Sequence, residues 1–348
     1  MLRARTRSFR ALAAAAALAA AAAACARPPK GMRRLDSGDL NHEFRLDARR
    51  RYLYYVEGGE DLATRLGVVN LDTGRRRSYR FTPEDIVAIR PALGADAVTV
   101  AVQDDDESDD ESYELLKVDA ATGRVLLRKP SDDLSEEDFA EFGGAPAFEA
   151  EPVGAPRPGV RTAAFRAGRR SLRFFPTETE PTSVVLAPGG KVDAAYEDAD
   201  GSWKIEELDP DGVRRTVASF PGEIGSMAVV GRGLAVLHRG AGGGPRLLAM
   251  VDASVGRVEL ELPWSDGDSE ILGADEAKRL LYLRMDEGDT RTCWAVRFDE
   301  DGLRAASAYL AAERGPNVRK LTATDVMGLV VMGGMLVLLA AFVAGTTA

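Results

Sequence analysis

The run "DDDESDDES" at residues 104–112 is the stretch that most strongly suggests chemistry, because oxygen-rich acidic loops bind hard cations such as Ca²⁺. An EF-hand loop beginning at Asp104 would need glycine at its sixth position and glutamate at its twelfth. The sequence has Asp109 and Leu115 at those positions. We therefore expect a solvated acidic loop and no bound metal, with an irregular calcium site as the alternative.

Histidine-, nucleophile- and phosphate-based sites have few candidates in this sequence. The two histidines, His42 and His238, lie far apart in the chain, and no G-x-S-x-G or H-E-x-x-H motif occurs. The glycine-rich stretch 239–248 lacks the Gly-Lys-Ser/Thr ending that cradles phosphate, so we expect a hairpin loop there. Cys293 lies in a strand-like run and is expected to be a buried free cysteine. No cofactor and no catalytic residue are predicted, and an enzyme is the less favoured class.

The elements that must position these residues recur along the chain. The stretch "LDTGRRRSYRF" around Gly74 runs from an apolar segment through Asp and a glycine turn into a second strand-like segment. Similar turns follow at intervals of 49, 45, 44, 44 and 46 residues, and most have a further strand candidate upstream, such as "RRYLYYVE". A period near 45 residues is typical of β-propeller blades. The turn glycines are Gly74, Gly123, Gly168, Gly212, Gly256 and Gly302.

The fold predicted from this repeat is all-β, a six-bladed β-propeller over residues 42–312, with seven blades as the alternative if one unit is undetected. Each turn glycine is expected to adopt positive φ, and the neighbouring Asp to accept hydrogen bonds from backbone amides. The stretch 131–160 fits the repeat least well. There we expect a degenerate blade with a surface insertion, or a loop that acts as a lid or partner site.

The second repeat, "LLKVDAATGRVLLRK", resembles the repeats of quinoprotein-type and WD40-like propellers, a group that includes outer-membrane assembly lipoproteins. The resemblance implies the propeller fold. It covers short hairpins only, and quinoprotein repeats usually carry Trp where Leu127 stands here. Neither quinone binding nor an assembly function is therefore carried over to this chain.

The two ends of the sequence indicate export and membrane attachment. Residues 1–25 have a basic start and an Ala- and Leu-rich run that ends at Cys25, which resembles a bacterial lipoprotein signal and implies lipidation of that cysteine. Cleavage at a nearby A-x-A site or an uncleaved anchor is the alternative. Residues 326–345 are long and apolar enough for a transmembrane helix, with a glycolipid-anchor signal as a minor alternative. Residues 26–41 and 313–325 are expected to be linkers.

Charge segregates between the two faces of the predicted propeller. In an antiparallel blade, the loops after strands one and three lie on one face, and the loops after strands two and four lie on the other. The first face is rich in arginine, whereas the second receives acidic loops such as 57–61, 104–112 and 131–138. Any one of these loops is expected to be merely solvated, so the interpretation depends on the segregation over all repeats. The candidate binding residues on the basic face are Arg75, Arg76, Arg169, Arg170, Arg214 and Arg215.

This segregation leads to a functional hypothesis. Both ends of the propeller are expected to leave on the acidic face, which would look toward the membrane and present the basic face to a protein or another anionic envelope partner. The net charge of −10 argues against nucleic acid as the partner. We expect an exported binding or scaffolding protein, anchored in the bacterial periplasm or cell envelope. The alternatives are a propeller hydrolase or lyase acting on an envelope sugar or peptide, and a protein whose helix assembles within a membrane complex.

Overall fold

The computed structural model describes most of the repeat region and little of either end of the chain. Residues 1–25, with Cys25, and residues 326–345 lie outside the described residues, as does the acidic run 104–112. Among the helices that the structure describes, none is long and apolar enough to cross a membrane. The described residues are 28–39, 43–47, 49–58, 64–81, 85–92, 95–103, 113–131, 134, 139, 150–152, 162–167, 170–176, 181–187, 191–198, 200–208, 214–265, 268–287 and 289–313.

The chain divides into two compact units. One consists of residues 29–308 and contains all the described strands. The other consists of residues 1–28 and 309–348, of which the structure describes Pro28 and the end of helix α3 (Glu300–Glu313). The sheets, turns and contacts below belong to the unit 29–308.

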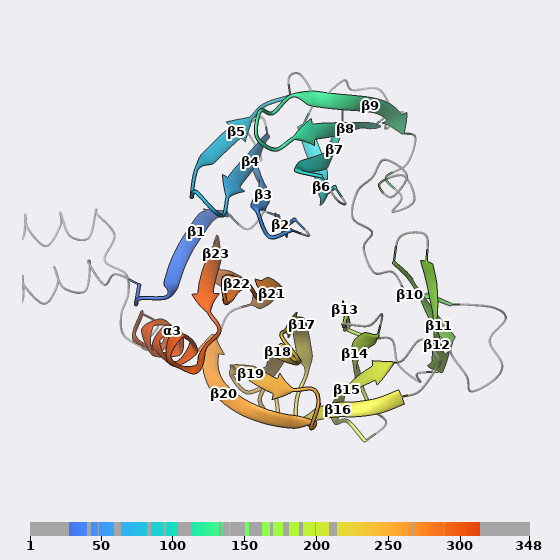
Figure 1. Ribbon diagram of the computed structural model, residues 1–348, viewed down its shortest axis with the longest axis vertical. Helices are drawn as coiled ribbons and strands as arrows, with labels where there is room; N and C mark the ends of the chain where they lie inside the picture. Colours follow the sequence, from blue (N-terminus) through green and yellow to red (C-terminus); the bar gives the residue numbers. More distant parts are fainter. Residues whose placement is uncertain are drawn as a thin grey trace, which may run out of the picture. The chain divides into compact units, whose positions relative to one another are not determined.

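The described strands form six antiparallel sheets, five with four strands and one with three (Figure 1). Sheet 1 contains β2 (Phe44–Leu46), β3 (Tyr52–Glu57), β4 (Arg65–Asn70) and β5 (Arg76–Tyr79). Sheet 2 contains β6 (Asp85–Pro91), β7 (Ala97–Gln103), β8 (Tyr113–Asp119) and β9 (Val125–Ser131). Sheet 3 contains β10 (Ala150–Pro152), β11 (Thr162–Ala167) and β12 (Arg170–Pro176).

The second half of the unit repeats the pattern. Sheet 4 contains β13 (Ser183–Leu186), β14 (Val192–Glu197), β15 (Trp203–Leu208) and β16 (Arg214–Phe220). Sheet 5 contains β17 (Ile224–Val230), β18 (Gly233–Arg239), β19 (Arg246–Asp252) and β20 (Arg257–Ser265). Sheet 6 contains β21 (Ser269–Asp275), β22 (Leu280–Glu287), β23 (Thr290–Arg297) and, from the start of the chain, β1 (Met32–Asp39).

Consecutive strands pair as neighbours in every sheet, and sheets 2, 1, 6, 5 and 4 contact one another in that order. This succession of sheets is the arrangement of a β-propeller-type repeat protein, so the predicted all-β repeat fold is confirmed. Middle strands such as β7 ("AVTVAVQ") are buried at almost every position rather than at every second one. Continuous burial is expected where a sheet is covered on both faces, because both sets of alternating side chains then leave water.

Apolar side chains fill the space between neighbouring sheets. Tyr54 and Ile89 belong to a cluster between sheets 1 and 2, and Ile205 and Val236 to one between sheets 4 and 5. Cys293 packs between sheets 6 and 1, where it is fully buried and free, as predicted. Burial raises the pKa of its thiol, so this cysteine acts as a small apolar residue.

Three of the predicted hairpin glycines have the expected geometry. Gly74, Gly123 and Gly256 have φ of 70°, 72° and 68°, which glycine adopts without a steric penalty. The side chain of Asp119 accepts hydrogen bonds from the Thr122 backbone N–H (2.7 Å) and hydroxyl (2.6 Å), as the prediction for Asp required. These turns therefore form from local sequence alone.

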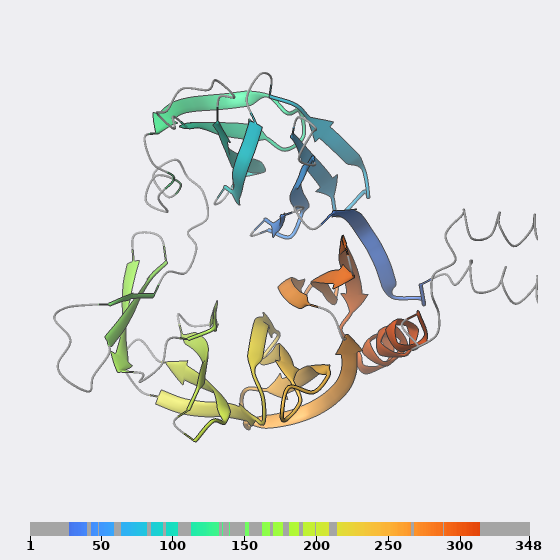
Figure 2. The ribbon, with the colours of Figure 1, turned by 180° about the vertical axis from the view of Figure 1, so that it is seen from behind.

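The first strand of the chain completes the last sheet. β1 pairs antiparallel with β23, so that Met32 lies opposite Val296 and Asp39 opposite Thr290. Figure 2, seen from behind, shows blue β1 beside orange β23. The segment 26–41, expected as a linker, thus contains a strand, and in the described residues after β23 no further strand occurs.

The hairpin predicted at Gly302 is instead the first turn of helix α3. The segment "EDGLRAASAYLAAE" is rich in alanine and other helix formers, which favour a helix over a strand. Asp299 caps the helix, because its carboxylate accepts a hydrogen bond from the Gly302 N–H at 2.8 Å. The Asp–Gly pair that elsewhere marks a hairpin therefore begins a helix here.

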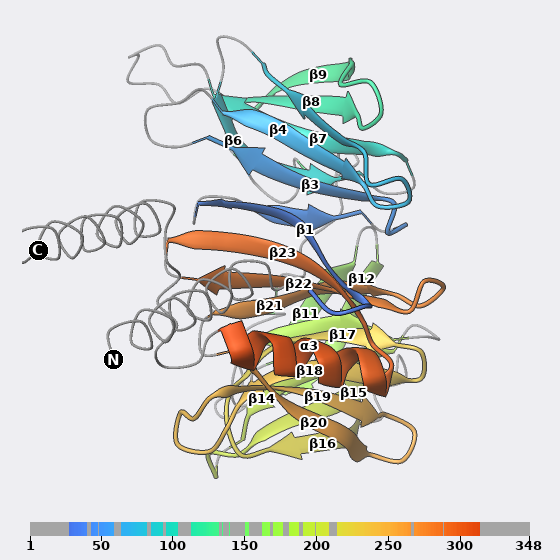
Figure 3. The same ribbon diagram turned by 90° about the vertical axis from the view of Figure 1, so that its left-hand side faces the viewer.

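The pairing of β1 also changes where the chain enters and leaves the sheets. The Gly31 carbonyl accepts a hydrogen bond from the Arg297 N–H at 2.8 Å, so the start of β1 lies beside the end of β23. This end of sheet 6 carries the turns that follow first and third strands. We had expected the chain to enter and leave the propeller on the opposite, acidic face. Helix α3 then runs back along β20, where the Ser307 hydroxyl donates to the Pro263 carbonyl at 2.6 Å (Figure 3).

Candidate functional site on the turn face

The turn face is the end of the sheets that carries the turns after the first and third strands, including residues 47–51, 71–75 and 275–279. Of the predicted basic residues, Arg75 and Arg76 lie at the last turn of sheet 1, and Arg215 lies in β16. Arg170 and Arg214 begin strands, their side chains being outside the described part, and Arg169 is not described. Arg75 and Arg76 thus lie at the turn after a third strand, which is the end of the sheet that strand order assigns to them.

Two of these arginines join neighbouring sheets. The Arg76 guanidinium forms an ion pair with Asp36 of β1 at 3.2 Å and donates to the Leu35 carbonyl. Arg215 pairs with Glu207 at 3.3 Å and donates to two carbonyls of sheet 5. Both therefore contribute to packing between sheets as well as to the charge of the face.

The turn between β2 and β3 is organised by one buried carboxylate. Asp47 is 1% exposed and accepts hydrogen bonds from the backbone N–H groups of Arg49 (3.1 Å), Arg51 (2.6 Å) and Tyr52 (2.7 Å). Arg50, at the centre of this turn, has φ of 56°, a left-handed conformation that non-glycine residues rarely adopt. A tightly bound turn is therefore needed to hold Arg50 in this conformation.

The side chain of Arg50 reaches from sheet 1 to sheet 6. Its Nη1 donates to the Asp47 carbonyl at 2.8 Å, and its Nε donates to the Ala274 carbonyl at 3.1 Å. Burial lowers the pKa of Arg50, and the nearby carboxylates of Asp47 and Asp275 partly offset this effect. The guanidinium of Arg50 thus forms hydrogen bonds to backbone carbonyls of both sheets.

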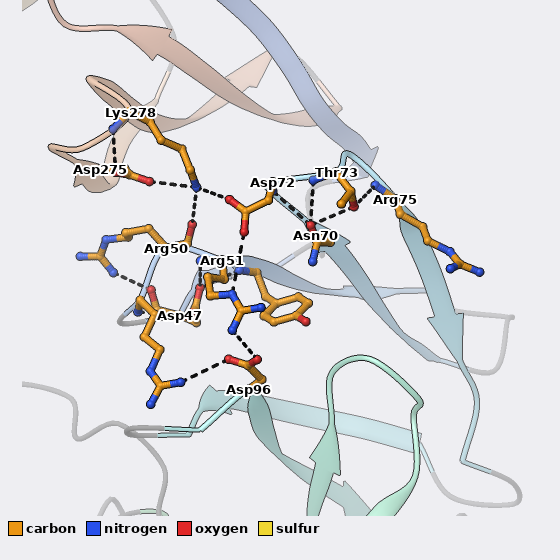
Figure 4. Close-up of polar contacts among 12 residues, drawn as sticks. Asp47, Arg50, Arg51, Asn70, Asp72, Thr73, Arg75, Asp96, Asp275 and Lys278 are labelled. Atoms are coloured by element: carbon orange, nitrogen blue, oxygen red, sulfur yellow. Dashed lines mark hydrogen bonds and ion pairs between the residues drawn. The ribbon is translucent and has the colours of Figure 1, made fainter.

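An ion-pair network links the turns of sheets 6, 1 and 2 (Figure 4). Lys278 pairs with Asp72 at 2.6 Å and with Asp275 at 3.1 Å. Arg51 pairs with Asp96 at 2.7 Å and approaches Asp72 at 3.8 Å. The side chains are partly exposed, so each pair contributes no more than about 1 kcal/mol. The network orients the turns more than it stabilises them.

The pKa of Lys278 reflects its place in this network. Burial lowers the pKa, but the hydrogen bonds to Asp72 and Asp275 outweigh burial and raise it above its usual value. Lys278 therefore stays charged at any physiological pH. Its ammonium also donates to the Arg50 carbonyl at 3.3 Å, which ties the turn of sheet 6 to that of sheet 1.

Beyond the network, the turn face presents cations outward. Arg75 extends away from the network (Figure 4), and its guanidinium has no ion pair with another described residue. Asp119 and Asp252 of the same turns accept hydrogen bonds from backbone N–H groups and hydroxyls of their own turns. The hydroxyls of Thr122 and Ser254 lower the pKa values of Asp119 and Asp252 respectively. Within the part of the chain that the structure describes, the exposed cations of this face without an ion pair are Lys30, Arg33, Arg75, Arg124, Arg232, Arg257 and Arg279.

The acids of the network were not anticipated from the sequence. The nearest signal is a shared pattern: Asp47 precedes the buried Tyr54 by the same spacing that separates Asp275 from the buried Tyr282, and arginines or lysines lie between. That recurrence marks two equivalent turns. It does not indicate that Asp96, from a third turn, pairs with Arg51.

A second cluster of titratable groups lies between sheets 4 and 5. The Asp193 side chain is 2% exposed and lies directly across from Glu207 on the next strand. Burial, and then the charge of Glu207, raise the pKa of Asp193 to about 6. A buried carboxyl group with a raised pKa is a candidate for acid–base chemistry, although structural clusters also contain such groups.

Metal-binding side chains do not gather in the described residues: no three His, Cys, Asp or Glu there could hold one ion. His238 is fully buried in β18, packs on the Phe220 ring at 4.4 Å and contacts Glu261 at 3.1 Å. The glycine-rich stretch 239–248 connects β18 to β19 as a hairpin loop, as predicted. Most of the acidic loops expected on the opposite face lie outside the described residues, so the acidic face stays a prediction.

No protein-family model matches the chain, and no curated protein matches it in sequence. Solved structures are similar at low identity. A luciferin-regenerating enzyme is 11% identical over 76% of this chain and 94% of its own, with a TM-score of 0.43. The β-propeller domain of Myceliophteria thermophila Cps50 (Swd1) is 12% identical over 75% of this chain and 100% of its own, with a TM-score of 0.39.

An acylaminoacyl peptidase is 12% identical over 76% of this chain, with a TM-score of 0.38, and this chain spans 46% of the peptidase's length. The similar structures thus include enzymes and a β-propeller domain. Likenesses this distant carry no argument about function. The fold assignment rests on the sheets and their pairing.

Proposed function

We propose that this chain is a six-bladed β-propeller, exported and held at the membrane of a bacterial cell envelope, that binds an anionic protein partner through its turn face. The single observation that carries the binding role is the outward row of cations without ion pairs, beside carboxylates that are engaged within their own turns. An unpaired arginine at the surface can form two parallel hydrogen bonds with a carboxylate, which suits an acidic protein surface.

Six blades are supported by the repeat and by β1. Six sheets are described, and five of the repeat glycines fall between the last two strands of sheets 1 to 5: Gly74, Gly123, Gly168, Gly212 and Gly256. Pairing of the first strand with the last sheet joins the two ends of the repeat, which removes a pair of open sheet edges. A seventh blade would need a unit that neither the repeat nor the described strands contain.

Membrane attachment is supported by the composition of residues 1–25 and 326–345. A lipid on Cys25 would be separated from β1 by residues 26–31, which span at most about 20 Å when fully extended. Because β1 begins at the turn face, such a lipid would bring the turn face close to the bilayer. We therefore propose that the partner lies at the membrane surface, in place of the outward presentation expected from the sequence.

Cross-linking and affinity purification of the full chain from detergent-solubilised membranes tests this function. The variant R75E/R124E reverses two exposed turn-face cations, and R80E reverses an exposed arginine at the opposite end of the first sheet as the matched control. We expect one acidic protein to be recovered with the wild type and with R80E, and lost with R75E/R124E and at high salt. Equal recovery with all three proteins would overturn the proposed role of the turn face.

A hydrolase or lyase acting on an envelope sugar or peptide is the second candidate, favoured by the Asp193–Glu207 pair alone. A catalytic acid must reach its substrate, whereas the Asp193 side chain is 2% exposed between two sheets. Turnover of envelope glycans or peptides by the wild type, abolished in D193N, would place this candidate first.

A further inference from the structure

Three charged residues of sheet 4 form a ladder across successive strands. Asp193 of β14 lies directly opposite Glu207 of β15, which lies directly opposite Arg215 of β16. Side chains of directly opposed residues project on the same side of a sheet and lie within about 5.5 Å of each other. On this side, Ala195 and Ile205 join the apolar cluster that packs against sheet 5. The ladder therefore lies at the seam between the two sheets.

The ladder contains a carboxyl group that lacks a full set of partners. Glu207 Oε1 accepts the Lys191 ammonium at 2.9 Å and lies 3.3 Å from the Arg215 guanidinium. Asp193, by contrast, has a buried Oδ1 without any hydrogen-bond partner among the described residues. The charged groups around Asp193 are Glu207 from β15, Arg215 from β16 and Lys191 from the preceding turn; its neighbour on β13 is the apolar Val185.

Arg215 connects this ladder to sheet 5. Its Nη2 donates to the Ala253 carbonyl at 2.6 Å, and its Nη1 donates to the Ser254 carbonyl at 3.2 Å. Both carbonyls belong to the turn between β19 and β20. The guanidinium is therefore shared between carbonyls of sheet 5 and a carboxylate of sheet 4, so its position depends on the charge of the acids beside it.

We propose that Asp193 and Glu207 form an acid pair that takes up one proton, and that this proton loosens the hold of Arg215 on sheet 5. With both acids ionised, two negative charges face the two positive charges of Lys191 and Arg215. Protonation of Asp193 leaves one negative charge, and the new O–H can donate to the Glu207 carboxylate that now orients Arg215. The attraction that holds the guanidinium in place falls accordingly.

The direction of the pKa of Asp193 agrees with this device. Burial and the charge of Glu207 raise it to about 6, so Asp193 takes up its proton as the pH falls from neutral to mildly acidic. Proton uptake would also leave Arg215 more available to an anion at the turn face. This inference concerns the seam between sheets 4 and 5 and does not require that the turn face binds a protein.

Hydrogen exchange of the full chain in detergent, read by mass spectrometry, tests the proposal. The readout is the protection of the 253–257 turn, corrected for intrinsic exchange rates, at about pH 5 and about pH 7.5. In the wild type we expect protection to be about three- to tenfold lower at the acidic pH, the effect of losing one charge-assisted contact. Unchanged wild-type protection between the two pH values would overturn the proposal.

Two variants identify the group responsible. Asp193→Asn should show the low protection at both pH values, because the amide mimics the protonated acid. Glu259→Gln, which neutralises an exposed acid on β20, should keep the wild-type pH dependence. Protection of β7 in sheet 2 reports that each variant is folded. A pH dependence that survives in a folded D193N protein would also overturn the proposal.

Discussion

Substituting Asp193 with asparagine should stabilise this protein at neutral pH, although it removes a charged residue from between two cations. The pKa of the carboxyl rises from its ordinary value of 3.8 to about 6 on folding. One pKa unit corresponds to about 1.4 kcal/mol, so the ionised form lowers the free energy of unfolding by roughly 3 kcal/mol. The attraction of Lys191 and Arg215 is already included in that pKa, because it partly offsets the effect of burial.

The sign of the pH dependence follows from the raised pKa. Below about pH 4, Asp193 is protonated in both the folded and the unfolded chain, so it does not change the free energy of unfolding. Between about pH 4 and pH 6, Asp193 loses its proton in the unfolded chain first, and the free energy of unfolding falls. Above about pH 6 the full cost is present. The free energy of unfolding of D193N should therefore exceed that of the wild type by about 1 to 3 kcal/mol at pH 7.5 and equal it near pH 4. The lower figure allows for an asparagine amide that lacks a hydrogen-bond partner.

Urea denaturation of the full chain in detergent, at several pH values, measures this gain. Glu259→Gln serves as the control, since the acid it neutralises is exposed and should give no pH-dependent gain. A D193N protein that is less stable than the wild type at pH 7.5, or equally stabilised at both ends of the pH range, would refute the reasoning. In that case the ionised carboxyl must be better solvated than its burial implies.

Two further predictions concern packing. Gly123→Ala should lower the free energy of unfolding by about 2 to 4 kcal/mol, because the added Cβ would lie 2.1 Å from the Tyr79 ring at a φ of 72°. The control Gly242→Ala, at a φ of 69° in open space, should lower it by only about 1 kcal/mol. Equal urea midpoints for the two variants would contradict the predicted clash with the Tyr79 ring. Tyr282→Phe should be neutral or stabilise by up to about 1 kcal/mol, since the buried hydroxyl has no partner among the described residues. If calorimetry shows that Tyr282→Phe destabilises the protein by more than about 1 kcal/mol, the hydroxyl must be hydrogen-bonded.

Local signals in the sequence were the most reliable guide to the fold. The glycine turns at Gly74, Gly123 and Gly256 were predictable because a positive φ and an Asp acceptor act within a few residues. The same signal failed at Gly302, where an alanine-rich segment follows and Asp299 caps a helix. A turn motif therefore predicts a hairpin only when strand-forming residues lie on both sides of it.

The candidate site was less predictable because its contacts join distant parts of the chain. Strand β1 ("MRRLDSGD") has little apolar alternation, and only its pairing with β23 makes it a strand. Likewise, the arginines of 49–51 can be read as a basic cluster, but their pairing with Asp96 depends on two sheets meeting. Asp193 gave no sequence signal, since a single acid in a strand is ordinary until its burial is known.

The way in which β1 completes the last sheet has a mechanical consequence. The chain enters at Met32 and leaves at Arg297 on the same end of one strand pair. Tension applied before Met32 and after Arg297 would load the hydrogen bonds between β1 and β23 one after another, and not all at once. Helix α3 must first be pulled away from β20, where Ser307 holds it. Pulling would thus open this seam first, while the other sheets, each of which is built from one continuous stretch of the chain, keep their pairing.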